Sequence, residues 1–257
     1  MLKIHYLGTC SGTEPMPDMH HCSWVLETEH GNYWFDAGEN CAHRAYTSGI
    51  DTQATRAIFV SHPHIDHIGG LANLLSCMRK ITGRYKKPMI NEGKLDIFFP
   101  QQSILDAIKV ILGELNYELR EHGIEDGVLY QDEKVTVSAL HNRHLREEGS
   151  NGWHSFSFLI EAEGKRIVFS GDVLKPDELD GLIGSGCDLL IMETGHHSVT
   201  DVCKYAVSRN VKVLRFNHHG REILEGREAA QNLIDKYAAE HGISIKLCYD
   251  GMMEDLI

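Results

Sequence analysis

The first forty residues alternate between apolar runs and turn-forming stretches. Apolar and aromatic positions cluster or alternate over residues 2–7, 23–27 and 33–35, a pattern typical of strands. Gly31-Asn32 lies between the last two runs, and such a pair predicts a hairpin turn. The chain is therefore expected to begin as an antiparallel sheet.

Beyond residue 38, predicted helices and strands alternate. A helix that begins near Gly69 has one apolar stripe at helical spacing, formed by Leu71, Leu74, Leu75 and Met78. Apolar patterns predict further strands at 57–60, 95–99, 134–140, 155–161, 166–169, 189–193, 211–216 and 244–247, and helices at 39–49, 102–119, 199–209 and 222–240. No pattern assigns a role to residues 252–257. The order is typical of an α/β protein, and a chain of 257 residues is expected to form a single domain, 1–257.

Three imidazoles and a carboxylate stand within six positions, at His62, His64, Asp66 and His67. Imidazole nitrogen and carboxylate oxygen are ligands of Zn²⁺, Mn²⁺ and Fe²⁺. A tight turn between a strand and a helix can aim some of these side chains at one ion and the rest at a second. An accidental cluster in a chain with 17 histidines is the alternative, but the strand–turn–helix context favours a metal site.

This segment has the pattern H-x-H-x-D-H, and three further motifs accompany it: LGTCSGTEP at 7–15, FDAGE at 35–39 and SGD at 170–172. On these motifs the chain resembles the metallo-β-lactamase-fold hydrolases and, among them, the ribonuclease Z and cyclic phosphodiesterase branch. The resemblance covers nearly the whole chain. It implies a four-layered αββα sandwich with the metals at one edge.

The remaining ligands are expected just after later strands. Asp172 follows the strand at 166–169, and its two carboxylate oxygens could bridge two cations. After the strand at 134–140 the resemblance implies a ligand at His144, with His141 as the second choice. After the strand at 211–216 it implies a ligand at His218.

By resemblance, these residues complete two metal positions. One ion would be held by His62, His64 and His144, the other by Asp66, His67 and His218, with Asp172 between them. A water that bridges such a cation pair has its pKa lowered toward neutrality. The expected mechanism is attack by a metal-bridging hydroxide, with two Zn²⁺ ions as the first choice and Mn²⁺ or Fe²⁺ as alternatives.

Other polar or aromatic positions near these motifs have two interpretations. In the resembling family an acid at the position of Asp36 supports a ligand histidine by accepting its second N–H; a surface Asp at a strand end is the alternative. His20 and His21 are expected to be exposed loop residues rather than ligands. Trp153, in the polar loop 145–154, either lines a substrate pocket or only fills space.

The candidate catalytic residues are Asp66, His196, His197 and Arg221. Ribonuclease Z-like proteins have a histidine immediately before the equivalent of Glu193 that helps to protonate the leaving group, whereas this chain has Met192 there. His196 or His197 could replace it, since a general acid needs reach and a suitable pKa; exposed loop histidines are the alternative. Arg221 could stabilise charge on phosphate oxygens or be a solvated residue at a helix start.

Charge and spacing narrow the choice of substrate. The net charge of −12 and the pI near 5.7 disfavour a protein that binds nucleic acid through a basic face. The five basic residues within 79–87 are interpreted as a solvated helix end in preference to a phosphate-binding patch. His144 and Asp172 are only 28 positions apart, too close for the long Gly/Pro-rich arm of tRNA-processing members. A small phosphodiester, cyclic ones included, is therefore the expected substrate, and a nucleic-acid partner is not expected.

Cysteine usage and hydropathy indicate the compartment. Seven scattered cysteines without a C-x-x-C pair are typical of buried thiols in a reducing environment. The N-terminus is typical of a first strand rather than of a signal peptide, and no apolar run is long enough to span a bilayer. A cytoplasmic protein without a membrane partner is expected. The sequence does not determine its oligomeric state, for which a dimer is one option.

Three other functions stay open as alternatives. The same hydroxide could attack the carbonyl of a lactone, thioester or β-lactam, although residues 7–15 resemble the phosphodiesterase branch. An iron oxidoreductase on the same fold is the second alternative; its diiron type has a carboxylate in place of the second motif histidine, which here is His64. A non-catalytic binder is the third, and the complete ligand set disfavours it because unneeded buried histidines and acids cost folding free energy.

Overall fold

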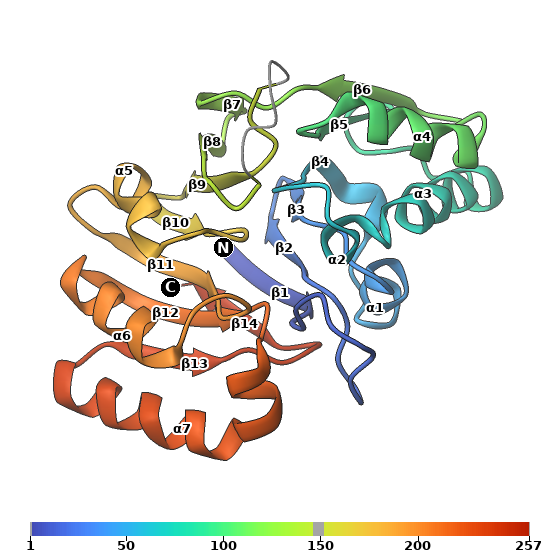
Figure 1. Ribbon diagram of the computed structural model, residues 1–257. Helices are drawn as coiled ribbons and strands as arrows, with labels where there is room; N and C mark the ends of the chain where they lie inside the picture. The colour runs from blue at the N-terminus through green and yellow to red at the C-terminus, as the bar shows by residue number, and fades with distance from the viewer. Residues whose placement is uncertain (1, 146–151, 257) are drawn as a thin grey trace. The chain divides into compact units, whose positions relative to one another are not determined.

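The computed structural model describes residues 2–145 and 152–256, and Figure 1 labels its helices and strands. The chain forms two compact units, one of Met1–Ile124 with Tyr249–Ile257 and the other of Glu125–Cys248. Each unit contains one seven-stranded sheet. Both units are of the expected α/β class, and the single domain 1–257 stays a prediction.

The first unit is built on a sheet with the strand order β14-β1-β2-β3-β4-β5-β6. The strands are β1 (Leu2–Gly8), β2 (Ser23–Thr28), β3 (Gly31–Phe35), β4 (Thr55–Phe59), β5 (Lys94–Phe98), β6 (Glu118–His122) and β14 (Met253–Leu256). Neighbours are antiparallel from β14 to β3 and parallel from β3 to β6. The expected antiparallel start is confirmed.

Helices cover one face of this sheet (Figure 1). They are α1 (Cys41–Thr47), the 3-10 turn η1 (Thr52–Ala54), α2 (Ile65–Ile68), α3 (Leu71–Tyr85) and α4 (Gln102–Leu112). The expected apolar stripe of α3 is fully buried and packs with strand residues such as Ile58 in one hydrophobic core. Each buried leucine of this stripe contributes roughly 2 kcal/mol by leaving water, so the stripe fixes which side of α3 faces the sheet.

The second unit is built on a sheet with the strand order β13-β12-β11-β10-β9-β8-β7. The strands are β7 (Gly127–Gln131), β8 (Val135–His141), β9 (Phe156–Ala162), β10 (Lys165–Phe169), β11 (Cys187–Glu193), β12 (Val211–Asn217) and β13 (Ser244–Leu247). Neighbours are antiparallel from β7 to β10 and parallel from β10 to β13. The carboxyl ends of β10, β11 and β12 therefore meet at one edge of the sheet.

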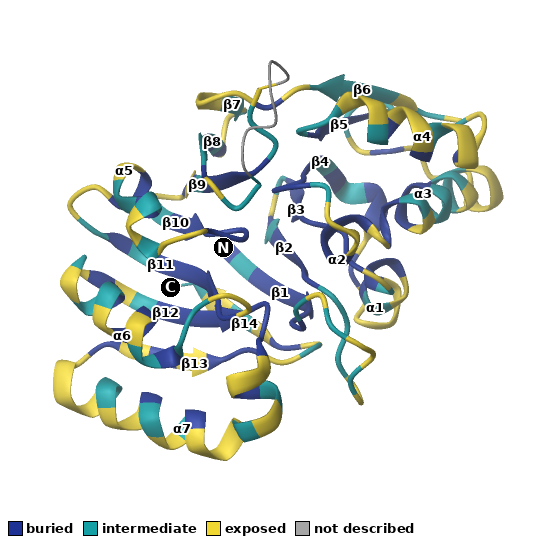
Figure 2. Ribbon diagram, viewed as in Figure 1, coloured by how far each residue is buried: buried dark blue, intermediate teal, exposed yellow. Residues whose placement is uncertain are grey.

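The helical elements of the second unit are η3 (Pro176–Leu179), α5 (Asp180–Ile183), α6 (Val199–Ser208) and α7 (Arg221–His241). α6 begins after Ser198, whose hydroxyl accepts the backbone N–H of Asp201 at 3.1 Å and so satisfies a donor that the helix leaves unpaired. Val202 of α6 and Ile234 of α7 pack with the strands in a second hydrophobic core. Figure 2 shows the outer face of α7 exposed and the strands mostly buried.

The expected helix 102–119 is wrong in its second half. α4 ends at Leu112, because Gly113 adopts a φ of +65° that an L side chain rarely tolerates. The chain then continues as β6, which pairs in parallel with β5. Leu119 still reaches the core from β6, and Tyr117 does so from the bend just before it.

The expected hairpin turn at Gly31-Asn32 is displaced by two residues. Thr28 pairs with Gly31, so the turn consists of Glu29-His30. The Thr28 hydroxyl accepts the backbone N–H of His30 at 3.1 Å and donates to the carbonyl of Gly31 at 3.0 Å. A threonine hydroxyl thus holds a turn in which no Asn-Gly pair is present.

Besides β6, two further strands were not expected from the sequence. β14 gives residues 253–256 a role, because it pairs antiparallel with β1 and places Leu256 opposite Leu2. The Tyr6 hydroxyl of β1 also donates to Glu254 at 2.9 Å. β7 pairs with β8 at the edge of the second sheet, and its mostly exposed residues lack the alternation that predicts a strand.

Within residues 2–145 and 152–256, no helix combines the length and the apolar character needed to cross a bilayer. None of the seven cysteines, all within the described residues, forms a disulfide, and six of them are buried, as expected. Cys77 on α3 is the partly exposed one. A cytoplasmic location stays a prediction.

The burial of the thiols predicts selective alkylation. Burial raises the pKa of Cys41, Cys187 and Cys203 to about 12, and reaction needs the accessible thiolate. Iodoacetamide should therefore modify Cys77 of the native protein about tenfold faster than any other thiol, as followed by peptide mass spectrometry. Cys77→Ser should leave the native chain almost unmodified; alkylation of Cys187 or Cys203 at a similar rate would contradict their burial.

Candidate metal centre

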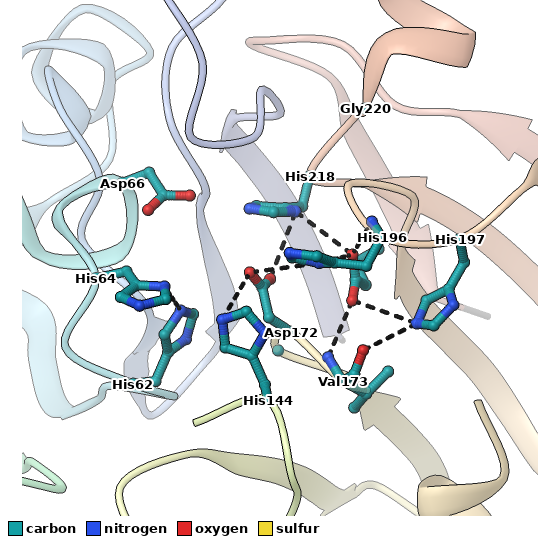
Figure 3. Close-up of polar contacts among 12 residues, drawn as sticks. His62, His64, Asp66, His144, Asp172, Val173, His196, His197, His218 and Gly220 are labelled. Carbon is teal, nitrogen blue, oxygen red and sulfur yellow. Dashed lines mark hydrogen bonds and ion pairs between the residues drawn. The ribbon is translucent and has the colours of Figure 1, made fainter. Parts of the chain in front are cut away.

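The motif segment of the first unit connects β4 to the short helix α2. His64 is the residue before α2, and Asp66 and His67 lie within it. His62 Nε2 is 3.0 Å from His64 Nδ1 (Figure 3), and the ring centroids of His62 and His67 are 4.1 Å apart. The imidazole donors of this unit therefore gather where β4 ends.

The carboxylate of Asp36 orients His67. Asp36 follows β3 and is fully buried, with a φ of +57°. Its Oδ1 accepts the backbone N–H of Ser61 at 2.7 Å, and its Oδ2 accepts the Ser61 hydroxyl at 2.9 Å and His67 Nδ1–H at 2.7 Å. The last bond fixes the tautomer in which His67 Nε2 carries the lone pair that a metal needs. The expected contact of Asp36 with a motif histidine is confirmed, and its surface alternative is wrong.

Two glycines let the backbone pass close to Asp66. A Cβ at Gly12 would lie 2.9 Å from the Asp66 carboxylate, and a Cβ at Gly38 would lie 2.6 Å from the Asp66 carbonyl oxygen. Both distances are shorter than real Cβ contacts allow. The glycines of the motifs at 7–15 and 35–39 are therefore required by the position of Asp66.

His20 is bound at both ring nitrogens, so the expectation that it is an exposed loop residue is wrong. Its backbone N–H and Nδ1–H donate to Asp250 at 2.7 and 2.8 Å, and its Nε2 accepts the Asn40 amide at 2.8 Å. Asp250 also accepts the Thr9 hydroxyl at 2.8 Å. His21 is partly buried as well, 3.9 Å from Glu39. These bonds hold the loop that contains Gly12.

In the second unit, candidate donors come from the ends of neighbouring strands. Asp172 follows β10, Glu193 ends β11 and His218 follows β12. His218 Nδ1 lies 3.4 Å from Asp172 Oδ1 and 3.8 Å from Glu193 Oε2 (Figure 3). His218 has a φ of +48°, which costs about 1 kcal/mol for a residue with a Cβ. The backbone is thus strained where it presents this imidazole.

Glu193 organises this cluster. Its Oε1 accepts the Val173 N–H at 2.9 Å, and its Oε2 accepts the N–H and the Nδ1–H of His196 at 2.9 and 2.8 Å. Burial alone would raise the pKa of Glu193, but the neighbouring His196 and His218 outweigh it and hold the pKa below its ordinary value. The hydrogen bond with Glu193 raises the pKa of His196. His196 is therefore held in a fixed orientation and favoured as a proton carrier.

The two candidate acids differ in their surroundings. His196 Nδ1 lies 3.8 Å from Asp172 Oδ2, and the side chain is 42% exposed. His197 Nε2 donates to the Val173 carbonyl at 2.9 Å, and the side chain is only 11% exposed. Met192 packs in the hydrophobic core of the unit, so its side chain takes no part in the cluster. The surroundings favour His196 over His197 as a group that meets substrate.

The structure separates His144 from His141. His144 Nε2 lies 3.7 Å from Asp172 Oδ2. His141 Nδ1 instead donates to Asp126 at 2.7 Å, and its ring stacks on Trp153 with centroids 4.1 Å apart. The geometry therefore favours His144 as the ligand. Residues 146–151 of the expected polar loop 145–154 lie outside the described residues.

The candidate arginine and the basic segment make ordinary surface contacts. Arg221 is the first residue of α7, and its guanidinium lies 3.4 Å from Glu225 one turn later. Arg79 donates to the carbonyls of Leu112 and Glu114 at 2.8 and 3.0 Å, which caps the end of α4. Lys87 pairs with Asp51. Part of the basic run 79–87 thus has a structural explanation.

The donors of each unit suit a divalent cation. In the second unit, four residues each offer one ligand atom, all within 4.8 Å of one another: Asp172, Glu193, His196 and His218. Mixed imidazole and carboxylate donors are typical of Zn²⁺, Mn²⁺ and Fe²⁺ sites. Glu193 was not expected among the site residues; an acid at the end of an apolar strand was the signal that could have found it.

Solved structures identify the fold. The metallo-beta-lactamase fold protein YhfI from Bacillus subtilis matches with a TM-score of 0.76 and 15% identity over 98% of each chain. Human tRNase Z, short form, matches with a TM-score of 0.73 and 20% identity over 99% of each chain. The chain is therefore an α/β protein of the metallo-β-lactamase fold, as expected.

Sequence relatives place the chain within this fold. It is 29% identical over 180 residues to a ribonuclease Z from Shouchella clausii, which covers 68% of this chain and 53% of that protein. The chain spans about half the length of such relatives. The expected resemblance to the ribonuclease Z branch is confirmed. Residues 2–221 match the family described as Anti-Pycsar protein Apyc1, and the chain belongs to this family.

Removal of the Asp36 carboxylate tests its role in the motif segment. Asp36→Ala leaves Ser61 and His67 without their buried acceptor, so the free energy of unfolding should fall by about 3 kcal/mol and Zn²⁺ affinity by roughly 10- to 100-fold. Denaturant unfolding and calorimetric titration measure the two effects. The control Asp106→Ala removes an exposed carboxylate of α4 and should change stability by less than about 0.5 kcal/mol. Wild-type values for Asp36→Ala would show that this carboxylate does not support the motif.

Proposed function

We propose that this chain is a metal-dependent hydrolase that cleaves small phosphodiesters, cyclic ones included. The observation that carries the proposal is the set of imidazole and carboxylate donors at strand ends in both units, in a chain whose relatives include enzymes named ribonuclease Z. A ribonuclease cleaves a phosphodiester, so its relatives are first candidates for the same chemistry.

Two divalent cations are proposed as cofactors, with Zn²⁺ as the first choice and Mn²⁺ or Fe²⁺ as alternatives. Their ligands would be His62, His64, Asp66 and His67 from the first unit and His144, Asp172 and His218 from the second. When bound, the cations would activate a water for attack on phosphorus. The Asp36 bond to His67 and the strained backbone at His218 support this assignment, because both hold an imidazole in one orientation before any metal binds.

His196 is the proposed general acid. Glu193 fixes its ring and raises its pKa, which keeps the imidazole protonated at a higher pH than usual. Its partial exposure allows contact with a leaving group. His197 instead anchors the following segment through the Val173 carbonyl.

Arg221 is proposed to stabilise the charge that develops on phosphate oxygens. It follows His218 by three positions, and its side chain is 53% exposed. Its partner Glu225 is also exposed, and a pair of this kind contributes only about 0–1 kcal/mol. The exposed guanidinium offers N–H donors whose geometry matches phosphate oxygens.

A small substrate is favoured over a structured RNA. Between His144 and Asp172, the described residues form only the strands β9 and β10, and the net charge of −12 gives little general attraction to nucleic acid. The name of the ribonuclease Z relatives keeps RNA as the second candidate. The exposed cations Lys80, Arg84 and Lys86 at the end of α3 are where an RNA strand would be attracted.

Two other chemistries remain to be separated by experiment. A hydrolase of lactones or thioesters would use the same donors on a carbonyl carbon, and an iron oxidoreductase would use them for redox chemistry. His64 favours the hydrolase over the diiron type, which has a carboxylate at this motif position. The relatives named ribonuclease Z favour phosphorus over carbonyl carbon.

Metal analysis tests the ligand assignment. Purified protein should hold close to two transition-metal ions per chain, and His144→Ala should lose about one of them because it removes one of the three imidazole ligands of that ion. The matched control His141→Ala should keep both, since His141 is bound to Asp126. Elemental analysis by mass spectrometry gives the stoichiometry. Metal loss in His141→Ala but not in His144→Ala would reverse the assignment, and a single stoichiometric iron with oxygenase activity would replace the hydrolase proposal.

A panel of substrates separates the reaction classes. The panel contains bis-(p-nitrophenyl) phosphate, cyclic nucleotides, a single-stranded oligoribonucleotide, a lactone, a thioester and a chromogenic cephalosporin, each with Zn²⁺ or Mn²⁺ added. We expect turnover of the diesters and little of the cephalosporin. Arg221→Ala should slow the diesters more than any carbonyl substrate.

The same panel measures the contribution of His196. His196→Ala should lower kcat for cyclic nucleotides about 100-fold and affect bis-(p-nitrophenyl) phosphate much less, because p-nitrophenolate leaves without being protonated. His197→Ala should cost less on both substrates. Equal losses of kcat on both substrates would exclude His196 as the general acid. Turnover of carbonyl substrates while every diester stays inert would exclude the proposed phosphodiesterase activity.

A further inference from the structure

The second unit contains two buried carboxylates whose charges face each other. Asp172 and Glu193 are 2% and 1% exposed, and both lie against His196 and His218. Two anions removed from water repel each other strongly unless cations lie between them. Protonated histidine can supply this charge, and so can a divalent metal, which supplies twice as much.

The distances within this cluster match those around a metal ion. Donors at about 2.0–2.2 Å from a tetrahedral ion lie about 3.3–3.6 Å from one another. His218 Nδ1 is 3.4 Å from Asp172 Oδ1 and 3.8 Å from Glu193 Oε2, and His196 Nδ1 is 3.8 Å from Asp172 Oδ2. The hydrogen bond from His196 Nδ1 to Glu193 Oε2 is shorter, at 2.8 Å. The cluster accepts an ion if this one contact opens by about half an ångström.

Backbone contacts orient the side chains of this cluster toward a common point at which an ion would bind. The Val173 N–H fixes Glu193 Oε1 at 2.9 Å and leaves Oε2 turned toward the two imidazoles. A Cβ at Gly195 would lie 2.7 Å from the His218 ring and 3.3 Å from Glu193 Oε2, so a glycine is needed between His196 and the strand end for the cluster to close. His196 is the most exposed of the four, which gives an ion a route in.

We propose that Asp172, Glu193, His196 and His218 by themselves form a binding site for one divalent cation of the zinc, cobalt or manganese class. The site uses residues of the second unit alone and needs none of the motif residues 62–67. It is distinct from the ligand set of the proposed two-metal enzyme, because Glu193 and His196 have no ligand role there.

The consequence is an order of metal loading. The first ion binds in the second unit, with His196 as one of its ligands. A second ion would need the motif residues of the first unit, so it would bind after the first. In the proposed function His196 is the acid and keeps its hydrogen bond with Glu193, so its ligand role belongs to the one-metal form alone. Only the second ion and the acid role rest on the proposed function; the one-metal site does not.

Removal of the motif tests the proposal on the full chain. The variant His62→Ala/His64→Ala/Asp66→Ala should keep close to one Co²⁺ or Zn²⁺ per chain after dialysis, as measured by elemental analysis. Addition of Glu193→Gln or of His196→Ala to this variant should reduce the content to near zero. The matched control, addition of His197→Ala, should keep the ion because His197 is bound to a backbone carbonyl. A folded triple variant without metal would overturn the proposal, and so would an ion that survives both Glu193→Gln and His196→Ala.

Cobalt spectroscopy of the intact protein covers the case in which the triple variant fails to fold. The first equivalent of Co²⁺ added to metal-free wild-type protein should give a visible absorption band that changes in Glu193→Gln and in His196→Ala but not in His64→Ala. The reverse result, a change in His64→Ala alone, would assign the first ion to the motif and overturn the proposal. Neither readout depends on substrate turnover, so an inactive protein that passes both tests would refute the phosphodiesterase and leave the one-metal site intact.

Discussion

The first unit depends on one buried carboxylate with three hydrogen bonds. Asp36 takes two of them from Ser61 and one from His67, and through them it joins the end of β3 to the end of β4 and to α2. A buried carboxylate without such donors would be strongly unfavourable, so the three segments have to arrive together. The positions of the motif imidazoles follow from that requirement.

In the second unit the buried carboxylate of Glu193 has the role that Asp36 has in the first unit. Glu193 ends a parallel strand, as Asp36 follows one, and it accepts two backbone N–H groups and one imidazole N–H. In both units an acid at a strand end fixes the tautomer of a histidine and draws the next segment toward the edge of the sheet. Close approach also explains two glycines: the Asp66 carboxylate lies directly against Gly12, and the His218 ring and Glu193 lie directly against Gly195.

The features that the sequence predicted are those with a local cause. The stripe of α3 depends on helical spacing, and the cluster at 62–67 depends on donor chemistry within six positions, so both were visible without a structure. The errors have non-local causes. β6 and β14 are strands because β5 and β1 offer them unpaired edges, and His20 is bound because Asp250, 230 positions later, reaches it. Glu193 ends an apolar strand, which is a local signal, but its partners Val173 and His218 come from other strand ends, so its place in the cluster has a non-local cause.

The pairing of β14 with β1 also affects how the protein folds during its synthesis on the ribosome. Leu2 pairs with Leu256, so the first sheet lacks an edge strand until residues 253–256 have been made. Contacts between such distant positions form slowly, because a long loop must close first. The second unit is one continuous segment, Glu125–Cys248. It can therefore finish folding before β14 has been synthesised and has paired with β1. An unpaired strand edge is open to other chains, and the time between synthesis of β1 and release of β14 is when this protein would be most prone to aggregate.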